Sequence, residues 1–329
     1  MEIQLQIQRQ RPQGAPYFQS YRLDANPGAT LLDCLLQLKG EQDGSLTFRK
    51  NCRNTICGSC AMVINGRSAL ACKENVAGEL RAFPAQTSEG LPLITVAPLK
   101  NLPVVKDLAV EMAPFWRDLE AVAPYLQTET PPQGEEFRQT PAQREQLNAL
   151  GNCILCGACY SECNAKQVNP DFVGPHALAK AQRLLGDNRD RGDSERLAQY
   201  NSAVSGVWGC TRCYQCNDVC PMEVAPMDQI GKIKQQILAK ESAASSRPVR
   251  HRKVLVDLVK AGGWVDERKF GVYVVGNYFR DLGGILSVLP LGLRLLVNGK
   301  FPLTFHPSQG TQTVKALIER VEAAISLNR

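Results

Sequence analysis

The first residues of the chain alternate between apolar and polar side chains. From Ile3 to Ile7 every second residue is aliphatic and glutamines lie between, a period of two that predicts a half-buried strand. Leucines between residues 31 and 38 then recur at helical spacing, and Thr30 with Asp33 resembles a capping box. This part of the chain therefore combines strand and helix.

Further short strands are expected up to about residue 100. Leu46–Arg49 and Leu91–Val96 are two of them. Between these, Ala61–Ile64 and Ser68–Cys72 flank Asn65-Gly66, a pair that favours the type I′ turn of a β-hairpin. A small β-rich domain over residues 1–103 is predicted.

From residue 104 onwards the apolar spacing becomes helical, and residues 104–244 are expected to form an all-α domain. The predicted helices of this part are Lys106–Glu120, Pro175–Leu185, Asp193–Tyr200 and Pro226–Ser242. Residues 245–329 read as a separate, mostly helical C-terminal extension whose last helix is Thr313–Ile325. Three regions are therefore expected.

Charge is distributed unevenly along the chain. The net charge is +6, from 38 basic and 32 acidic side chains among 329 residues. Residues 241–329 carry 13 basic and 7 acidic side chains, so this region holds the whole excess. Because interleaved surface aromatics and a known module are missing, nucleic acid is not expected as a partner. An anionic membrane surface or an acidic partner suits the basic region better.

The sequence predicts no signal peptide and no membrane-spanning helix. The N-terminus lacks a basic segment followed by an apolar run, and the longest apolar stretch, Leu282–Val297, is short and contains Pro290 and Arg294. A peripheral position on the cytoplasmic face of a membrane is expected. Thirteen cysteines, an odd number, indicate a reducing compartment.

Twelve of these cysteines form three blocks whose spacings are those of iron–sulfur ligands. The first block has the plant-type C-x4-C-x2-C spacing with a fourth cysteine after eleven intervening residues, and it predicts a [2Fe–2S] centre. Its members are Cys52, Cys57, Cys60 and Cys72. Gly58 lies between two of these ligands, where the absence of a Cβ lets the backbone approach a cluster closely.

The other two blocks share the spacing C-x2-C-x2-C-x3-C, which is typical of bacterial two-cluster ferredoxins. In such proteins the fourth cysteine of each run binds the cluster of the other run. The expected ligand sets are Cys153, Cys156, Cys159 and Cys220 for one [4Fe–4S] centre, and Cys163, Cys210, Cys213 and Cys216 for a third cluster. Structural zinc is the main alternative, because thiolates bind zinc as well. No other metal site is expected, and Cys34, which lies among leucines, is expected in the core.

The order of elements together with these spacings predicts an α+β protein. A β-grasp plant-type ferredoxin domain would be followed by a helical ferredoxin domain and the C-terminal extension. No catalytic Ser/His/Asp set, phosphate loop or paired carboxylates stand out, and the three histidines follow no ligand spacing. Three clusters in one chain indicate a protein that conducts electrons.

The chain resembles the iron–sulfur subunits of succinate dehydrogenase and fumarate reductase over roughly residues 1–240. The residues that carry the resemblance are 52–62, Ile64-Asn65-Gly66, Leu70-Ala71-Cys72, 102–108, 152–156, Asn169-Pro170, Gly174-Pro175 and Cys220-Pro221. The resemblance implies a flavoprotein partner with covalent FAD that oxidises succinate. It also implies that electrons pass from FAD through three clusters to quinone, and that a membrane-anchor subunit is present. No catalytic residue would lie in this chain.

Four departures from the family concern the third cluster. Cys213 stands where most members lack a cysteine and hold a [3Fe–4S] cluster, so a second [4Fe–4S] is expected here. Gln167 and Val168 replace two common tryptophans, and Thr211 replaces a histidine close to quinone. The extension beyond residue 240 is similar to the C-terminal region of heterodisulfide-reductase-type ferredoxin subunits, which dock a cysteine-rich partner. The electron exit is therefore expected to be atypical.

Two alternatives to a succinate dehydrogenase subunit remain open at this point. One is the iron–sulfur subunit of a fumarate reductase, linked to quinol or to thiols. The other is a stand-alone polyferredoxin that carries electrons between enzymes. The segment Pro103–Leu108 and the basic extension favour a docked subunit over a free carrier.

Overall fold

A computed structural model describes residues 1–128, 136–242 and 246–327, with side chains described as far as residue 324. The chain divides into two compact units, Met1–Gln235 and Gln236–Arg329. The boundary expected between residues 244 and 245 lies outside the described residues.

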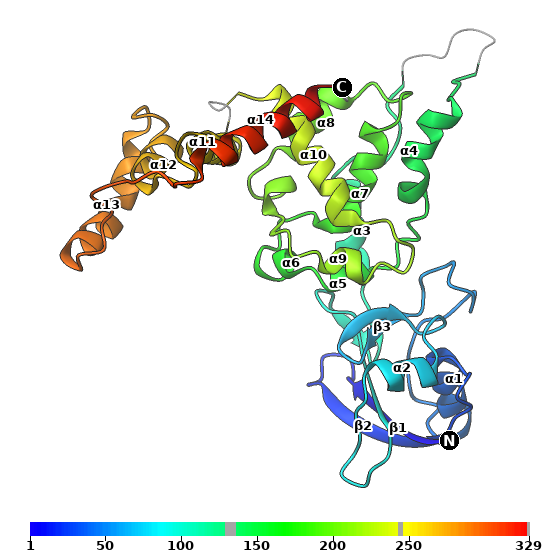
Figure 1. Cartoon of the computed structure of the whole chain (residues 1–329). Coiled ribbons are helices and arrows are strands. Elements are labelled where there is room, and N and C mark those ends of the chain that lie inside the picture. The colour runs from blue at the N-terminus through cyan, green and yellow to red at the C-terminus, as the bar shows by residue number, and fades with distance from the viewer. Residues whose placement is uncertain (129–135, 243–245, 328–329) are drawn as a thin grey trace. The chain divides into compact units, whose positions relative to one another are not determined.

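The N-terminal part of the first unit is built on a five-stranded sheet with the order β2-β1-β5-β3-β4 (Figure 1). β1 and β5 pair in parallel at its centre, and the other neighbours are antiparallel. The strands are β1 (Glu2–Arg9), β2 (Tyr17–Asp24), β3 (Ala61–Ile64), β4 (Arg67–Leu70) and β5 (Leu93–Ala97). With helices α1 (Leu31–Glu41) and α2 (Val76–Ala82), this is the predicted β-grasp arrangement.

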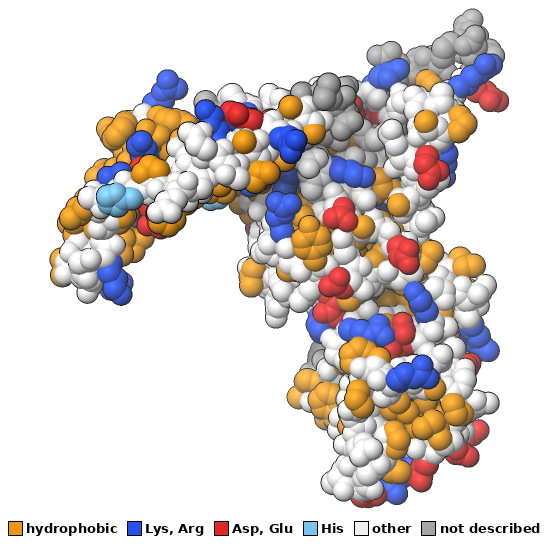
Figure 2. Space-filling view, in the orientation of Figure 1, with side chains coloured by type: hydrophobic (Ala, Val, Ile, Leu, Met, Phe, Trp, Pro, Cys, Tyr) orange, Lys and Arg blue, Asp and Glu red, His pale blue; other side chains and the backbone are white. Residues whose placement is uncertain are grey.

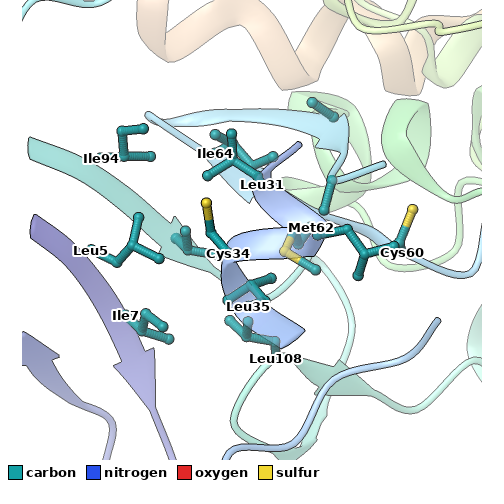
Figure 3. Close-up of a cluster of buried hydrophobic side chains, with 14 of the residues drawn as sticks. Leu5, Ile7, Leu31, Cys34, Leu35, Cys60, Met62, Ile64, Ile94 and Leu108 are labelled. Carbon is teal, nitrogen blue, oxygen red and sulfur yellow. The ribbon is translucent and has the colours of Figure 1, made fainter. Parts of the chain in front are cut away.

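The predicted alternation along β1 is confirmed. Ile3, Leu5 and Ile7 are fully buried, because one face of β1 packs on α1 (Figure 3). Cys34 projects from α1 into the same cluster and is 1 % exposed, so it is the core residue that the sequence predicted.

Local signals at two turns are confirmed as well. Thr30 caps α1, with the side chains of Thr30 and Asp33 each accepting from the backbone of the other. Asn65 and Gly66 join β3 to β4 with positive φ angles of 47° and 84°, as a type I′ turn requires. The hairpin that ends near Cys72 is therefore specified locally.

Two sequence predictions in the first unit were wrong. Residues 46–49 form no strand, and the expected helix Lys106–Glu120 is instead a small hairpin, β6 (Val104–Lys106) and β7 (Ala109–Val110), followed by α3 (Ala113–Glu120). The cause is Asp107, which takes a φ of 51° in the turn. Its carboxylate accepts hydrogen bonds from Arg9 and from the backbone amides of Gln10 and Thr47, so tertiary contacts replace both the strand ladder and the helix.

The rest of the first unit is helical, which confirms the expected α+β class (Figure 1). α7 is its central element, with nine of its twelve residues buried and contacts to α3, α4, α5 and α8. The elements are α4 (Pro141–Gly151), α5 (Ala158–Ser161), α6 (Asn164–Val168), α7 (Gly174–Leu185), α8 (Asp193–Tyr200), the 3-10 turn η1 (Val207–Gly209), α9 (Gln215–Asp218) and α10 (Pro226–Lys240).

The second unit consists of the end of α10 and four further helices. They are α11 (Arg247–Gly262), α12 (Glu267–Val274), α13 (Leu282–Val297) and α14 (Thr311–Leu327). α11 contacts both α12 and α14, and Arg250 ties α11 to the end of α12 by donating to the carbonyl of Val274. Among the described residues, no helix is long and apolar enough to cross a membrane.

Candidate iron–sulfur sites

The first cysteine block lies on a loop whose backbone amides point at sulfur atoms. The amides of Asn54 and Cys57 both donate to Cys52 Sγ at 3.3 Å, and the amide of Thr55 donates to Cys72 Sγ at 3.3 Å. The amides can point at the sulfur atoms because several residues of the loop have a left-handed backbone conformation, among them Thr55 with a φ of 57°. Thiolates with amide donors around them form the environment that a [2Fe–2S] centre needs.

The acidity of these thiols differs with their surroundings. Burial raises the pKa of Cys60 to about 12. Burial also acts to raise the pKa of Cys57, but hydrogen bonds from Ser59 and Cys52 outweigh it and lower that pKa to about 6. Cys57 is therefore the more readily ionised of the two thiols, and a thiolate is the form in which cysteine binds metal.

Gly58 brings the first loop into contact with the second cysteine run. A Cβ added at Gly58 would lie 2.8 Å from both Cα and Cβ of Cys156, and its φ is 70°. Both the closeness and the left-handed backbone demand glycine. The first and second cysteine blocks are therefore adjacent in space although about a hundred residues separate them in sequence.

The second expected ligand set surrounds a single pocket. Three cysteines of the second run and the last cysteine of the third run line it, together with apolar side chains and His176: the cysteines are Cys153, Cys156, Cys159 and Cys220. The structure thus brings together the four cysteines that were expected to share one cluster, three from the second run and the fourth cysteine of the third run. Apolar surroundings and thiol donors suit a [4Fe–4S] cluster.

The third expected set also gathers, around the start of α9. The pKa of Cys216 is raised to about 12, first by burial and then by the nearby thiols of Cys210, Cys163 and Cys213. The pKa of Cys163 is raised by burial, and the thiols of Cys210 and Cys213 add to this. Buried thiols this close together resist ionising unless a cation binds them.

The second and third runs repeat one backbone conformation. Leu155 and Gly157 have positive φ angles of 55° and 85°, and Arg212 and Tyr214, at the matching positions, have 61° and 65°. A short helix, α5 or α9, follows each loop. In this repeat Cys213 takes the place of Cys156, although Cys213 is exposed. A tyrosine in the left-handed region costs about 1 kcal/mol, so packing must hold the third loop in this shape.

A polar network connects the sheet domain to the second cysteine run. The side-chain amide of Asn101 donates to the carbonyls of Tyr160, Ser161 and Cys163 at 2.9–3.1 Å. The hydroxyl oxygen of Ser68 on β4 lies 2.8 Å from both Ser161 Oγ and the carboxylate of Glu162, which accepts a hydrogen bond from it. These bonds tie the segment before Cys163 to the first domain. The sequence offered no signal for them, because the partners lie about sixty to ninety residues apart.

A buried lysine lies beside the third set. Lys234 on α10 is 9 % exposed, donates to the carbonyl of Cys210 at 3.3 Å and has its ammonium 5.6 Å from the ring centre of Trp208. Burial lowers the pKa of Lys234, and the neighbouring Cys210 opposes this shift. The residues that replace the family's tryptophans and histidine, namely Gln167, Val168 and Thr211, are exposed. Among the described residues, no three His, Cys, Asp or Glu side chains form a site for a single metal ion.

Comparisons with known proteins agree with this geometry. Residues 4–117 match the family model of a 2Fe-2S iron-sulfur cluster binding domain, and residues 149–224 match that of a 4Fe-4S dicluster domain. The chain has the domains that bind both types of cluster.

Relatives and a solved structure are similar over most of the chain. The fumarate reductase iron-sulfur subunit of Mycobacterium tuberculosis is 37% identical over 236 residues, covering 70% of this chain and 91% of the relative. The mitochondrial succinate dehydrogenase iron-sulfur subunit 3 of Arabidopsis thaliana is 35% identical, covering 73% and 75%. A chain of the Mycobacterium smegmatis Sdh1 complex has the same fold, with a TM-score of 0.62 at 24% identity, covering 73% of this chain and 97% of that one. This chain therefore belongs to the family of succinate dehydrogenase and fumarate reductase iron–sulfur subunits.

Proposed function

We propose that this chain is the electron-transfer subunit of a succinate dehydrogenase. In this role it carries electrons from the FAD of a flavoprotein subunit towards quinone, while the chemistry on succinate takes place in the flavoprotein. The observation that carries the proposal is the contact of Gly58 with Cys156, because it places two cysteine sets next to each other in one unit. Adjacent redox sites suit conduction along the chain.

The twelve cysteines of the three blocks are the proposed ligands. The first block would hold [2Fe–2S], and the pocket that Cys220 shares with the second run would hold [4Fe–4S]. Bound there, the clusters would supply one-electron oxidation and reduction. The protein contributes amide donors at the first loop and an apolar lining at the pocket, both of which tune redox potential.

We propose that the third cluster is [4Fe–4S], with Cys213 as a ligand. The matching backbone of the second and third runs supports this, because Cys213 corresponds to Cys156 in the same turn. Replacing Cys213 with alanine should create a [3Fe–4S] signal in the EPR spectrum of the oxidised protein. Cys34→Ala, which removes a core thiol, serves as the control and should leave the spectrum unchanged. A stoichiometric [3Fe–4S] signal in the intact, unsubstituted protein would refute the assignment.

The partners proposed are the flavoprotein and an anchor or cysteine-rich subunit, with quinone near the third cluster or on the anchor. The domain limits 1–103, 104–244 and 245–329 remain part of this proposal, as does a peripheral position at the cytoplasmic face of a membrane. Exposure of Gln167, Val168 and Thr211 supports an exit for electrons at the protein surface. A partner that docks there would accept them.

A fumarate reductase subunit is the second candidate, because several relatives carry that name. A stand-alone polyferredoxin is the third. Purification through a tag on this chain distinguishes the polyferredoxin from the two complex subunits. A flavoprotein with bound FAD should co-purify with a subunit of either complex, whereas a free carrier should purify alone. The rates of succinate oxidation and of fumarate reduction by the purified complex, measured with artificial redox dyes, then distinguish a succinate dehydrogenase from a fumarate reductase.

A further inference from the structure

Helix α13 in the second unit is apolar and uncovered. Within the described part of the chain it contains no buried residue, although most of its side chains are hydrophobic. In the space-filling view, hydrophobic side chains gather over α12 and α13 (Figure 2). A long exposed apolar surface of this kind marks a site of interaction.

The leucines of α13 form a stripe along one side. Exposed leucines recur at intervals of four and three residues, at Leu282, Leu286, Leu289, Leu293 and Leu296. Three further large hydrophobic residues of α13, Val288, Leu291 and Val297, are exposed beside or outside this stripe and widen the apolar surface. A groove on a partner protein covers one stripe of a helix, whereas lipid can cover a broader surface.

The dimensions of α13 suit the surface of a bilayer better than its interior. Sixteen residues of helix extend about 24 Å, which is less than the roughly 30 Å of a hydrocarbon core. One flank of the helix beside the leucine stripe carries the small and polar residues Gly283, Ser287 and Arg294, and the rest of its surface is mostly apolar. A short helix with a polar flank suits the plane of the membrane, with its apolar surface inserted and the polar flank towards the headgroups.

Charge and aromatic residues around α13 agree with this orientation. Arg280, Arg294 and Lys300 lie just before, within and just after the helix, with Asp281 as the one acidic residue between 280 and 300. Tyr278 and Phe279 are exposed in the turn before the helix and have positive φ angles of 55° and 67°. Basic and aromatic side chains at the edges of an apolar segment are typical of contact with lipid headgroups.

The start of α13 packs closely against the segment that follows α12. A Cβ at Gly276 would lie 2.6 Å from Cγ1 of Ile285, and a Cβ at Gly284 would lie 2.4 Å from the carbonyl oxygen of Val275. Both glycines therefore permit a tight turn in which Ile285 packs against Gly276. The leucines of the stripe stay exposed beside this contact and are available to a membrane.

We propose that α13 inserts its leucine face into one leaflet of an anionic membrane and thereby attaches this chain directly to lipid. This proposal goes beyond the proposed function, because this chain would bind lipid directly, in addition to any attachment through an anchor subunit. The occupant is the bilayer, because a broad apolar surface with basic borders matches anionic headgroups above hydrocarbon.

The test is binding of the full-length, cluster-containing chain to protein-free vesicles of phosphatidylcholine with and without phosphatidylglycerol, measured by co-sedimentation. The wild-type chain should bind anionic vesicles more tightly than neutral ones, and added salt should weaken the binding. The double variant Leu289→Glu/Leu293→Glu should lose at least about tenfold in affinity, because it places two charges in the inserted face. The triple variant Arg280→Gln/Arg294→Gln/Lys300→Gln should bind anionic and neutral vesicles with similar affinity.

A matched control is available on α14. Leu317 and Val321 have the same four-residue spacing as Leu289 and Leu293, and their exposed fractions of 56 % and 58 % compare with 50 % and 53 %. Leu317→Glu/Val321→Glu should therefore bind vesicles as the wild type does.

Three outcomes would overturn the proposal. In the first, the Leu289→Glu/Leu293→Glu variant binds vesicles as tightly as the wild type. In the second, the α14 control loses as much vesicle affinity as the α13 variant. In the third, the wild type binds native membranes but not protein-free vesicles. The last outcome would assign the surface to a protein. The EPR signals of the clusters and dye-linked succinate oxidation should be unchanged in all variants, so failure of this proposal is distinguishable from failure of the proposed function.

Discussion

Gly58→Ala tests the contact between the first two cysteine blocks. The new methyl group would lie 2.8 Å from Cα and Cβ of Cys156. Carbon atoms pack at about 3.5 Å or more, so the two loops must separate by about 0.7 Å. A backbone contact cannot be relieved by rotating a side chain, and this displacement should therefore reach the metal sites.

The energetic cost has two parts that a control can separate. Alanine in the left-handed region costs about 1–2 kcal/mol, and overpacking adds about 1–3 kcal/mol. Gly66→Ala carries only the first cost, because Gly66 has a φ of 84° and no other atom lies within 4 Å of its added Cβ. For a unit of this size, the extra cost at Gly58 lowers the unfolding midpoint by roughly 2–12 °C relative to Gly66→Ala.

Two assays follow the effect. Loss of visible cluster absorbance on heating at a fixed scan rate gives the apparent midpoint of each variant. EPR of the reduced protein gives the magnetic interaction between the first two centres, which should weaken in Gly58→Ala and stay unchanged in Gly66→Ala. Equal midpoints and equal spectra for the two variants would show that Gly58 is not a point of contact between the sites.

Further predictions concern single charged side chains of the first unit. Lys234→Met should lower the reduction potential of the third cluster, as seen in an EPR redox titration, because a nearby unit charge interacts by on the order of 2 kcal/mol, or about 100 mV for one electron. An unchanged potential would exclude an electrostatic role for Lys234. Asp187→Asn should reduce stability at neutral pH by about 1 kcal/mol, because Arg189 and Arg183 hold the pKa of Asp187 well below its usual range. The stability contributed by the ionised Asp187 carboxylate is fully present above about pH 4 and is lost as the pH falls towards its depressed folded-state pKa. The melting temperatures of wild type and variant should therefore converge in acid. A difference in melting temperature that stays constant with pH would contradict this prediction.

The parts of the fold that the sequence predicted well are those with local causes. The alternation from Ile3 to Ile7, the capping box at Thr30 and the turn at Asn65-Gly66 each determine structure within a few residues, and all three are confirmed.

The errors arose where distant residues decide the local structure. Helical spacing after Lys106 was overridden by Asp107, whose carboxylate binds groups on two other segments. Nothing near Asn101 in the sequence indicates that its side chain holds the carbonyls around Ser161. Lys234 likewise appears in the sequence as an ordinary surface residue of a helix, and only packing against Trp208 shows that it is buried.

The close contact at Gly58 combines both kinds of cause. A glycine between two ligand cysteines was expected from its freedom to approach a cluster of its own loop. The structure adds a second reason, which is the backbone of Cys156 directly opposite. Spacing within a run can be read from sequence, whereas the approach of one run to another depends on how the two domains pack.

We propose that this chain receives electrons from a succinate-oxidising flavoprotein. The most direct test of this proposal is anaerobic addition of succinate to the complex purified through a tag on this chain, followed by EPR. Succinate should produce cluster signals in this chain, and prior removal of the flavoprotein should abolish them. Clusters that dithionite reduces but that succinate leaves oxidised in the intact complex, at every substrate concentration tested, would contradict it.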